Sequence, residues 1–303
     1  MCHPQQNQHN LQMDARSAFF WVSCSVFHVR SAAIFAAHHR KSLMPEQNTP
    51  ETEALQFTNV AALYDLLMTG VPYDDWVTYI EELLESRNAA PKRVLDLACG
   101  TGNVSVLLAE KGYEVTGVDI AADMIEAARQ KPVQPGWRME FFNQDAAEMD
   151  LGDRRFDLCI SLFDSLNYIT DPQRLQMAFH RIAHHLEEGA LLIFDVNSEY
   201  ALKNRFFDQD NRDYPEERLM YDWKSVYDEK TRICRVYMAF WYREDDGTTR
   251  EFKEVHVQFA YKAPELVAML ETAGFTDIST YQAYTMRMPG RTADRLYFVA
   301  RKG

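Results

Sequence analysis

The sequence of 303 residues predicts an α/β fold, with a mostly parallel sheet covered by helices and an antiparallel, β-rich insertion in the last third. Two patterns lead to this prediction. From residue 93 to residue 196, short branched apolar runs alternate with stretches whose apolar residues recur every three to four positions. From residue 219 to residue 261, long runs rich in aromatic residues alternate in polarity. The first pattern is typical of parallel strands joined by helices, and the second of antiparallel strands.

Before the alternating part, apolar residues at helical spacing predict helices at 59–68 and 76–84. The alternating part predicts strands at 93–97, 114–119, 139–142, 156–162 and 190–196, with helices at 103–111, 122–131 and 172–186. Gly112, Pro132 and Gly189 stand where these three helices are expected to end. In such a sheet, ligands bind beyond the carboxyl ends of the strands.

Three longer strands are expected in the last third, at 219–226, 232–242 and 250–261. Their simplest placement is a lid inserted after the fifth strand, over about 200–262. A helix at 264–273 and strands at 276–284 and 295–300 follow, and these two strands would complete the main sheet as an antiparallel hairpin. The expected result is a Rossmann-like, seven-stranded, mostly parallel sheet with helices on both faces.

The composition is that of a globular protein, with 47% apolar and 25% charged residues. The formal net charge is −13 and no stretch is rich in Lys and Arg, so nucleic acid is a poor candidate for a partner. The five cysteines show no CxxC spacing. The sequence therefore predicts neither a metal site nor a disulfide framework, and it favours a reducing compartment, the cytoplasm.

Residues 1–43 differ from the rest, because Asp14 is their one acidic residue. Their apolar stretch is too short to span a bilayer, which takes about 20 apolar residues, and no basic segment of a signal peptide precedes it. We expect an N-terminal extension that is disordered or an over-extended gene start, with a transit peptide as the alternative. The folded domain is expected to cover 44–303.

A glycine-rich turn, Asp96-Leu97-Ala98-Cys99-Gly100-Thr101-Gly102-Asn103, follows the first strand and opens a helix. Glycines let the main chain turn tightly and approach a ligand closely. Asp119 ends the next strand, where a carboxylate can accept hydrogen bonds from both hydroxyls of a ribose. A plain strand–helix connection is the alternative for the glycines alone.

Dinucleotides and S-adenosylmethionine (SAM) both use such a turn. A dinucleotide site usually carries a third glycine, which is absent here, since Ser105 stands in its place. Asp96 would also face a pyrophosphate unfavourably, whereas a sulfonium and an ammonium group would tolerate its charge. The combination favours SAM.

The run from Val94 to Gly102 closely resembles the first motif of class I SAM-dependent methyltransferases. The resemblance implies that Asp119 binds the ribose and that Asp145, beside Ala146, binds the adenine. It covers residues 57–200 well and the last third only in architecture. Within this family, the segment Asp-Ser-Leu-Asn-Tyr at 164–168 resembles that of small bacterial methyltransferases, and aminosugar N,N-dimethyltransferases and glycine N-methyltransferases share the general plan.

The motif and the resemblance together imply a SAM site whose residues come from the turn and from the strand ends around it. The expected residues are Tyr64, Tyr73, Asp96, Ala98, Gly100, Gly102, Asn103, Asp119, Ile120, Met124, Asp145, Ala146 and Leu162. Tyr64 and Tyr73 are expected to close over the methionine end of SAM, with packing on a helix face as the alternative.

The methyl acceptor is expected just beyond the fourth strand, where Asp164 or Asn167 would orient an amine or a hydroxyl, with Tyr64 as a third catalytic candidate. The alternative for residues 165–167 is a helix cap. His256 lies in a predicted lid strand among aromatic residues, and it either packs there or faces the substrate. A neutral amine needs only a lone pair at the right distance, so the sequence assigns no general base.

The implied reaction is in-line displacement of the methyl group of SAM by a nitrogen or oxygen nucleophile of a small molecule, releasing S-adenosylhomocysteine. The alternatives are methylation of RNA or protein, and a regulator that binds SAM without catalysis. The loop at 162–168 lacks the prolines of an Asn-Pro-Pro-Tyr-like loop, which disfavours RNA or protein. We expect no membrane segment, and a monomer or a homodimer.

Overall fold

The structure is a computed structural model that describes residues 56–57, 60–214 and 217–303. The extension predicted at 1–43 lies outside the described residues. The main sheet has seven strands, in the order β10-β11-β5-β4-β1-β2-β3. They are β1 (Arg93–Leu97), β2 (Glu114–Asp119), β3 (Arg138–Asn143), β4 (Phe156–Ser161), β5 (Leu186–Asn197), β10 (Phe275–Gln282) and β11 (Arg295–Lys302). The strands β1 to β5 pair in parallel, and β11 is antiparallel to both β5 and β10, which confirms the predicted sheet.

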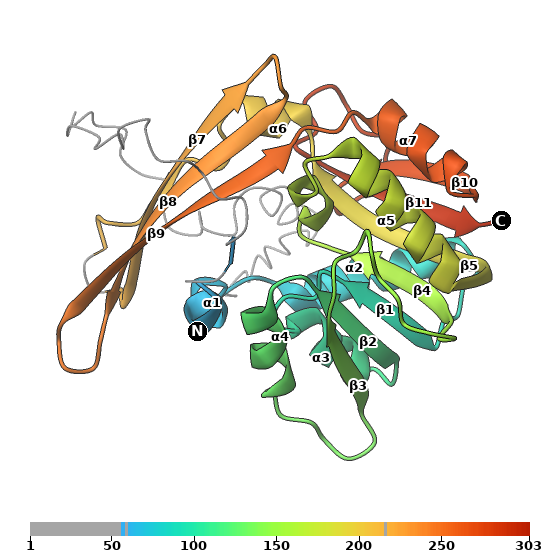
Figure 1. Cartoon of the computed structure of the whole chain (residues 1–303), viewed down its shortest axis with the longest axis horizontal. Coiled ribbons are helices and arrows are strands. Elements are labelled where there is room, and N and C mark those ends of the chain that lie inside the picture. The colour runs from blue at the N-terminus through green and yellow to red at the C-terminus, as the bar shows by residue number, and fades with distance from the viewer. Residues whose placement is uncertain (1–55, 58–59, 215–216) are drawn as a thin grey trace, which may run out of the picture.

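Helices cover both faces of this sheet (Figure 1). They are α2 (Tyr73–Ser86), α3 (Asn103–Glu110), α4 (Ala122–Arg129), α5 (Pro172–His185) and α7 (Ala263–Thr272). Because successive residues of a strand point to opposite faces, Leu158 packs with α2 and α3, while the next residue, Cys159, packs with α5 and α7. The main core is therefore two apolar layers separated by the sheet.

The chain between α6 (Glu199–Lys203) and α7 forms a second, antiparallel sheet. Its order is β6-β7-β8-β9, with β6 (Gln209–Asp210), β7 (Leu219–Asp228), β8 (Ile233–Arg243) and β9 (Thr249–Phe259). Figure 1 shows the long strands β7, β8 and β9 beside the main sheet, with α1 (Tyr64–Leu67) near them. Trp223, Val236 and Phe240 of this sheet pack with Leu63, which precedes α1, and with Leu67 of α1. The sheet lies within the predicted insertion, and its action as a lid stays a prediction.

Two expected boundaries were wrong. The helix predicted at 59–68 is, in its described part, a 3-10 turn at Ala61–Leu63 followed by the short α1. Gly189 does not end a helix, because α5 ends at His185 and β5 begins at Leu186. Gly189 lies where the register between β4 and β5 shifts, and its φ is 79°. This glycine therefore allows an irregularity inside the strand β5. Among the described residues, no helix has the length and apolarity needed to cross a bilayer.

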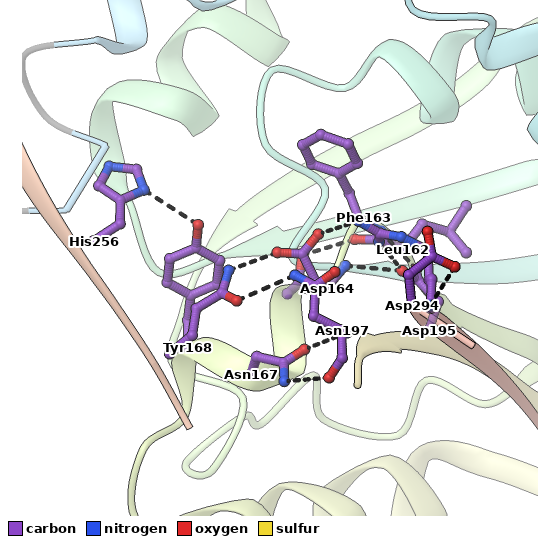
Figure 2. Close-up of polar contacts among 12 residues, drawn as sticks. Leu162, Phe163, Asp164, Asn167, Tyr168, Asp195, Asn197, His256 and Asp294 are labelled. Carbon is purple, nitrogen blue, oxygen red and sulfur yellow. Dashed lines mark hydrogen bonds and ion pairs between the residues drawn. The ribbon is translucent and has the colours of Figure 1, made fainter. Parts of the chain in front are cut away.

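A buried ion cluster joins the two sheets beyond β4 (Figure 2). Arg295, the first residue of β11, donates to Asp164 at 2.7 Å and also to Asp195 of β5. The carboxylate of Asp195 accepts the backbone N–H of Phe163 at 2.6 Å and that of Asp164 at 3.0 Å. Gln258 of β9 donates to the other oxygen of Asp164 at 2.6 Å. The carboxylates of Asp164 and Asp195 together thus link the loop after β4 to three other strands, β5, β9 and β11.

The loop held by this cluster is strained. Phe163 and Asp164 have φ values of 63° and 52°, in the left-handed region that side chains other than glycine rarely adopt. Each such residue costs on the order of 1–3 kcal/mol and persists only where its surroundings fix it. Here the hydrogen bonds that both backbone N–H groups donate to Asp195 hold the loop in this conformation.

We predict that Arg295→Met lowers the free energy of unfolding by about 3–5 kcal/mol, because two buried carboxylates lose their cationic partner. Chemical denaturation followed by circular dichroism measures this. Arg138→Met is a matched control, since Arg138 is largely exposed and its pair with Glu114 is worth at most about 1 kcal/mol. Equal losses in the two variants would contradict the role given to the cluster.

Candidate active site

The glycine-rich turn leads from β1 into α3. Ala98, Gly100 and Gly102 have φ values of 59°, 54° and 78°, so the chain reverses direction through three left-handed residues. A Cβ atom on Gly102 would lie 3.2 Å from the ring of Phe141 and 3.3 Å from Ala128. Gly102 therefore allows the start of α3 to pack closely against β3 and α4.

Two acidic side chains border this turn. The carboxylate of Asp119 accepts the backbone N–H groups of Gly100 and Ala121, both at 2.8 Å, so the end of β2 fixes the shape of the turn. Burial raises the pKa of Asp119. Asp96 is only 3% exposed and accepts a hydrogen bond from Ser105 at 2.5 Å. Burial raises the pKa of Asp96 to about 7, although the bond from Ser105 works against it.

A cavity of about 920 Å³, including its open mouth, lies over the turn, and we call it the turn cavity. Ten residues expected for SAM line it: Tyr64, Tyr73, Asp96, Ala98, Gly100, Asn103, Asp119, Ile120, Met124 and Leu162. The other lining residues are Phe57, Trp76, Cys99, Thr101, Val104, Phe163, Ser165 and Tyr168. Ile120 is 68% exposed and adjoins Asp119, so it offers an apolar surface beside an acid.

Three residues expected for SAM do not line this cavity. Gly102 packs against Phe141 as described above. Asp145 accepts the backbone N–H of Ala147 and a hydrogen bond from Arg174, both at 2.8 Å, and Ala146 packs against the main core. The assignment of Asp145 and Ala146 to the adenine therefore stays a prediction.

Sequence reasoning missed some lining residues for different reasons. Trp76 stands one helical turn after Tyr73 on α2, and their rings are 5.1 Å apart, so helical spacing could have found it. Thr101 lies within the motif itself. Phe57 carries no such signal, because only the fold brings this residue to the cavity.

The short helix α1 is fastened to the turn through Asp65. One oxygen of Asp65 accepts from Thr101 at 2.6 Å and from Asn103 at 3.0 Å, while the other accepts from Lys131 at 2.8 Å. Burial opposes ionisation of Asp65, but the hydrogen bonds from Lys131 and Thr101 outweigh it and lower its pKa. Tyr64, the preceding residue, is thereby held over the cavity.

A second cavity of about 810 Å³, including its mouth, lies between the loop after β4 and the second sheet, and we call it the second-sheet cavity. Apolar and aromatic side chains form most of its wall: Phe57, Val60, Tyr64, Leu67, Met68, Phe163, Phe206, Phe207, Trp223, Val236, Met238 and Phe240. Its polar lining residues are Asp164, Tyr168, Gln209, His256 and Arg295. Phe57, Tyr64, Phe163 and Tyr168 line both cavities, so the two meet at four aromatic rings.

The structure places the three catalytic candidates in three different settings. Tyr64 lies at the junction of the cavities. Asp164 lines the second-sheet cavity, but both of its oxygens are engaged by Arg295 and Gln258. Asn167 is fully buried within a 3-10 helix at Ser165–Tyr168, where its amide bonds to the backbone of Asn197 and Phe259. This geometry gives Asn167 a structural role, as a cross-link between the ends of β5 and β9 rather than as the helix cap that was the alternative. Asn167 is not among the residues lining either cavity.

Comparison with known proteins decides the family. The family profile described as a methyltransferase domain matches residues 94–189. A provisionally assigned methyltransferase of Geobacillus sp. (strain WCH70) is 35% identical over 251 residues, which are 82% of this chain and all of that protein. The chain belongs to the SAM-dependent methyltransferases.

Solved structures agree with this family. A SAM-dependent methyltransferase from Clostridium acetobutylicum superposes with a TM-score of 0.71 and 27% identity, over 82% of this chain and 99% of that one. A SAM-bound amino pentose methyltransferase from Micromonospora echinaspora shares the fold with a TM-score of 0.62 and 23% identity, over 84% of this chain and all of that one. The resemblance drawn from the sequence motifs is confirmed, and SAM is the cofactor of this enzyme.

The turn cavity suits this cofactor chemically. SAM carries two cationic groups, a ribose and a flat base, and the cavity offers a buried acid, a second acid at a strand end and an exposed apolar side chain. Because Asp96 is buried with a raised pKa, a nearby cation would favour its ionised form. The donor and acceptor groups of the cavity thus fit the ligand that the family uses.

The raised pKa of Asp96 predicts that SAM affinity falls as the pH is lowered from 8 to 6. The pKa of Asp96 is about 7, so at lower pH the free protein is protonated at Asp96. This proton must leave before the carboxylate can stabilise a cation. Isothermal titration with SAM across this range measures the effect. The variant Asp96→Asn should bind SAM more weakly and lose this pH dependence, whereas equal wild-type affinity at pH 6 and 8 would contradict the linkage.

Proposed function

We propose that this enzyme methylates a small molecule at nitrogen or oxygen, and that SAM binds in the turn cavity while the acceptor binds in the second-sheet cavity. The observation that carries this proposal is the junction of the two cavities at Phe57, Tyr64, Phe163 and Tyr168. A methyl group can pass directly from one ligand to the other only where their sites are continuous.

SAM supplies an electrophilic methyl group on a sulfonium when it is bound. The protein's contribution is to align the two ligands and exclude water, because charge is dispersed as the methyl group moves. The four aromatic rings at the junction serve both purposes. Their faces attract a cation, and their bulk closes the passage to solvent. Tyr64 keeps its proton, because burial raises its pKa.

On the cofactor side, we assign Asp119 to the ribose and Asp96 to the cationic end of SAM. Gly100 and Gly102 shape the main chain beneath the ligand, and Asp65 fastens α1 above it. On the acceptor side, Asp164 acts through Arg295 by setting the shape of the loop, so it is a positioning residue.

A small acceptor is favoured over RNA or protein by the lining of the second-sheet cavity. This wall is mainly aromatic and aliphatic, and the whole chain has a net charge of −13. RNA binding would need a basic channel. The amino pentose methyltransferase that shares this fold also acts on a small molecule. A cytoplasmic location and a monomeric or homodimeric state stay predictions from the sequence.

We predict that Asp119→Ala weakens SAM binding by about 1–3 kcal/mol, the scale of a lost hydrogen bond to a charged group. Isothermal titration measures this, and Asp123→Ala is the matched control, since Asp123 is an exposed acid near the start of α4. Unchanged affinity in Asp119→Ala would show that the ribose lies elsewhere.

A screen of a metabolite library with methyl-labelled SAM tests the proposed function. We expect label on a small molecule and none on total RNA or protein. Transfer to RNA or protein alone would overturn the proposal. SAM binding without any transfer would support the non-catalytic alternative instead.

A further inference from the structure

Hydrogen bonds link two polar side chains of the second-sheet cavity, Tyr168 and His256, to the buried Glu254. We propose that Tyr168, His256 and Glu254 form a proton relay, and that the acceptor is an uncharged, mostly apolar hydroxyl compound, a phenol or an alcohol. This inference rests on the proposed function, because it requires the acceptor to lie in the second-sheet cavity.

The three side chains form a continuous chain of hydrogen bonds. The hydroxyl of Tyr168 lies 3.2 Å from Nδ1 of His256 (Figure 2). Nε2 of His256 lies 2.7 Å from Oε2 of Glu254. His256 and Glu254 are buried, and the backbone N–H groups of Phe57 and Val60 also donate to the Glu254 carboxylate, at 3.3 and 3.0 Å. Glu254 is thus an acceptor in every one of these contacts.

This arrangement fixes where the proton of His256 lies. Nε2 faces a carboxylate, so it must carry the hydrogen, because an imidazole lone pair would be repelled there. In the neutral ring, which the relay requires, Nδ1 is then unprotonated and accepts the hydrogen bond of Tyr168. The Tyr168 oxygen keeps lone pairs for another donor. Burial raises the pKa of Tyr168, so the phenol passes a proton on rather than existing as a phenolate.

Tyr168 stands where the proton is released. It lines both cavities, whereas His256 lines only the second-sheet cavity. A nucleophile at the junction can therefore donate its hydrogen bond to Tyr168 while it faces the turn cavity. The rings of Tyr168 and His256 both pack against Phe57, with centroids 5.2 and 4.4 Å away, which keeps the relay in an apolar setting.

The charges of the cavity favour an uncharged acceptor. An ammonium group buried here would need a carboxylate partner. Asp164 lines the cavity, but Arg295 and Gln258 already occupy both of its oxygens, and Glu254 lies behind His256. A neutral amine needs no relay, because its methylated product is a stable ammonium ion. A hydroxyl does need one, since its methylated form stays strongly acidic until the proton leaves.

The proposed step transfers one methyl group and moves two protons. The hydroxyl oxygen forms a bond to the methyl carbon, and the carbon–sulfur bond breaks with its electron pair left on sulfur. The hydroxyl proton passes to the oxygen of Tyr168, and the proton of Tyr168 passes to Nδ1 of His256. Glu254 stabilises the imidazolium that results, so it is a positioning residue.

The test uses the full-length enzyme, methyl-labelled SAM and matched pairs of probes. The pairs are 4-propylphenol with 4-propylaniline, 2-naphthol with 2-naphthylamine, and 3-phenylpropanol with 3-phenylpropylamine. We expect transfer to at least one hydroxyl probe and faster transfer to it than to its amine. Transfer only to amines, or to no probe while SAM binding persists, would overturn the hydroxyl assignment. Loss of SAM binding in the turn cavity would instead overturn the proposed function.

Variants then test the relay itself. Tyr168→Phe and His256→Gln should each lower kcat for the hydroxyl probe by about 100-fold or more, with SAM affinity unchanged. Tyr113→Phe and His180→Gln are matched controls, because Tyr113 and His180 line neither cavity, and they should leave kcat unchanged. A large loss in Tyr168→Phe without one in His256→Gln would show that the proton does not pass to His256.

The pH profile separates this role from mere packing. The groups around His256 are Glu254 on its own strand, Tyr168, Tyr64 on α1, Asp164 after β4 and Arg295 on β11. In the wild type, kcat should fall at low pH as His256 takes up a proton, and His256→Gln should lose this fall. Glu254→Gln should shift the fall to lower pH, because an amide stabilises the imidazolium less. A wild-type fall at low pH that persists in His256→Gln would overturn the relay.

Nitrogen NMR of the histidine rings gives a check that needs no acceptor. With S-adenosylhomocysteine bound at neutral pH, His256 should carry its proton on Nε2 and leave Nδ1 free. A proton on Nδ1 would overturn the relay, because Tyr168 could then not donate to it.

Discussion

The buried contact of Arg295 with Asp164 and Asp195 is the interaction on which the rest of the site depends. Removing three charges from water is costly, and the mutual attraction of the group and its added hydrogen bonds offset this cost. Its position explains why the cost is tolerated. Asp195 holds the strained loop at Phe163, and the guanidinium of Arg295 lies 5.5 Å from the Phe163 ring centroid. The Phe163 ring, at the junction of the two cavities, is therefore held in place by residues of the main sheet.

The segment before α2 links the two cavities in another way. Asp65 fastens α1 to the glycine-rich turn and to Lys131, and Glu254 of the second sheet accepts the backbone N–H groups of Phe57 and Val60. One short stretch of chain thus covers both cavities and is bonded to the walls of each.

Much of this architecture could be predicted from the sequence. The parallel strands of the main sheet contain apolar runs that alternate with helical patterns, so periodicity found them, and the spacing of Asp96, Gly100, Gly102 and Asp119 identified the cofactor. These features are local, because each motif residue lies near its partners along the chain. The β4–β5 irregularity was misread, since a glycine that ends a helix and one inside a strand irregularity look alike in sequence.

The acceptor side was much less predictable, because its contacts are long-range. Asp164 attracted attention as an acid after a strand, but Arg295, its partner, lies 131 positions away. Asn167 was expected to orient the acceptor or to cap a helix, but its bonds to Asn197 and Phe259, which are distant in sequence, make it a cross-link instead. The role proposed for His256 rests on its contacts with Tyr168 and Glu254. No spacing pattern in the sequence predicts the contact between Tyr168 and His256.

The most direct test of the central claim is a crystal structure of the enzyme with S-adenosylhomocysteine and a transferable hydroxyl probe. We predict that the sulfur lies at the junction formed by Phe57, Tyr64, Phe163 and Tyr168, with the probe hydroxyl facing it from the second-sheet cavity. A sulfur atom that lies away from this junction, or a probe bound outside the second-sheet cavity, would contradict it.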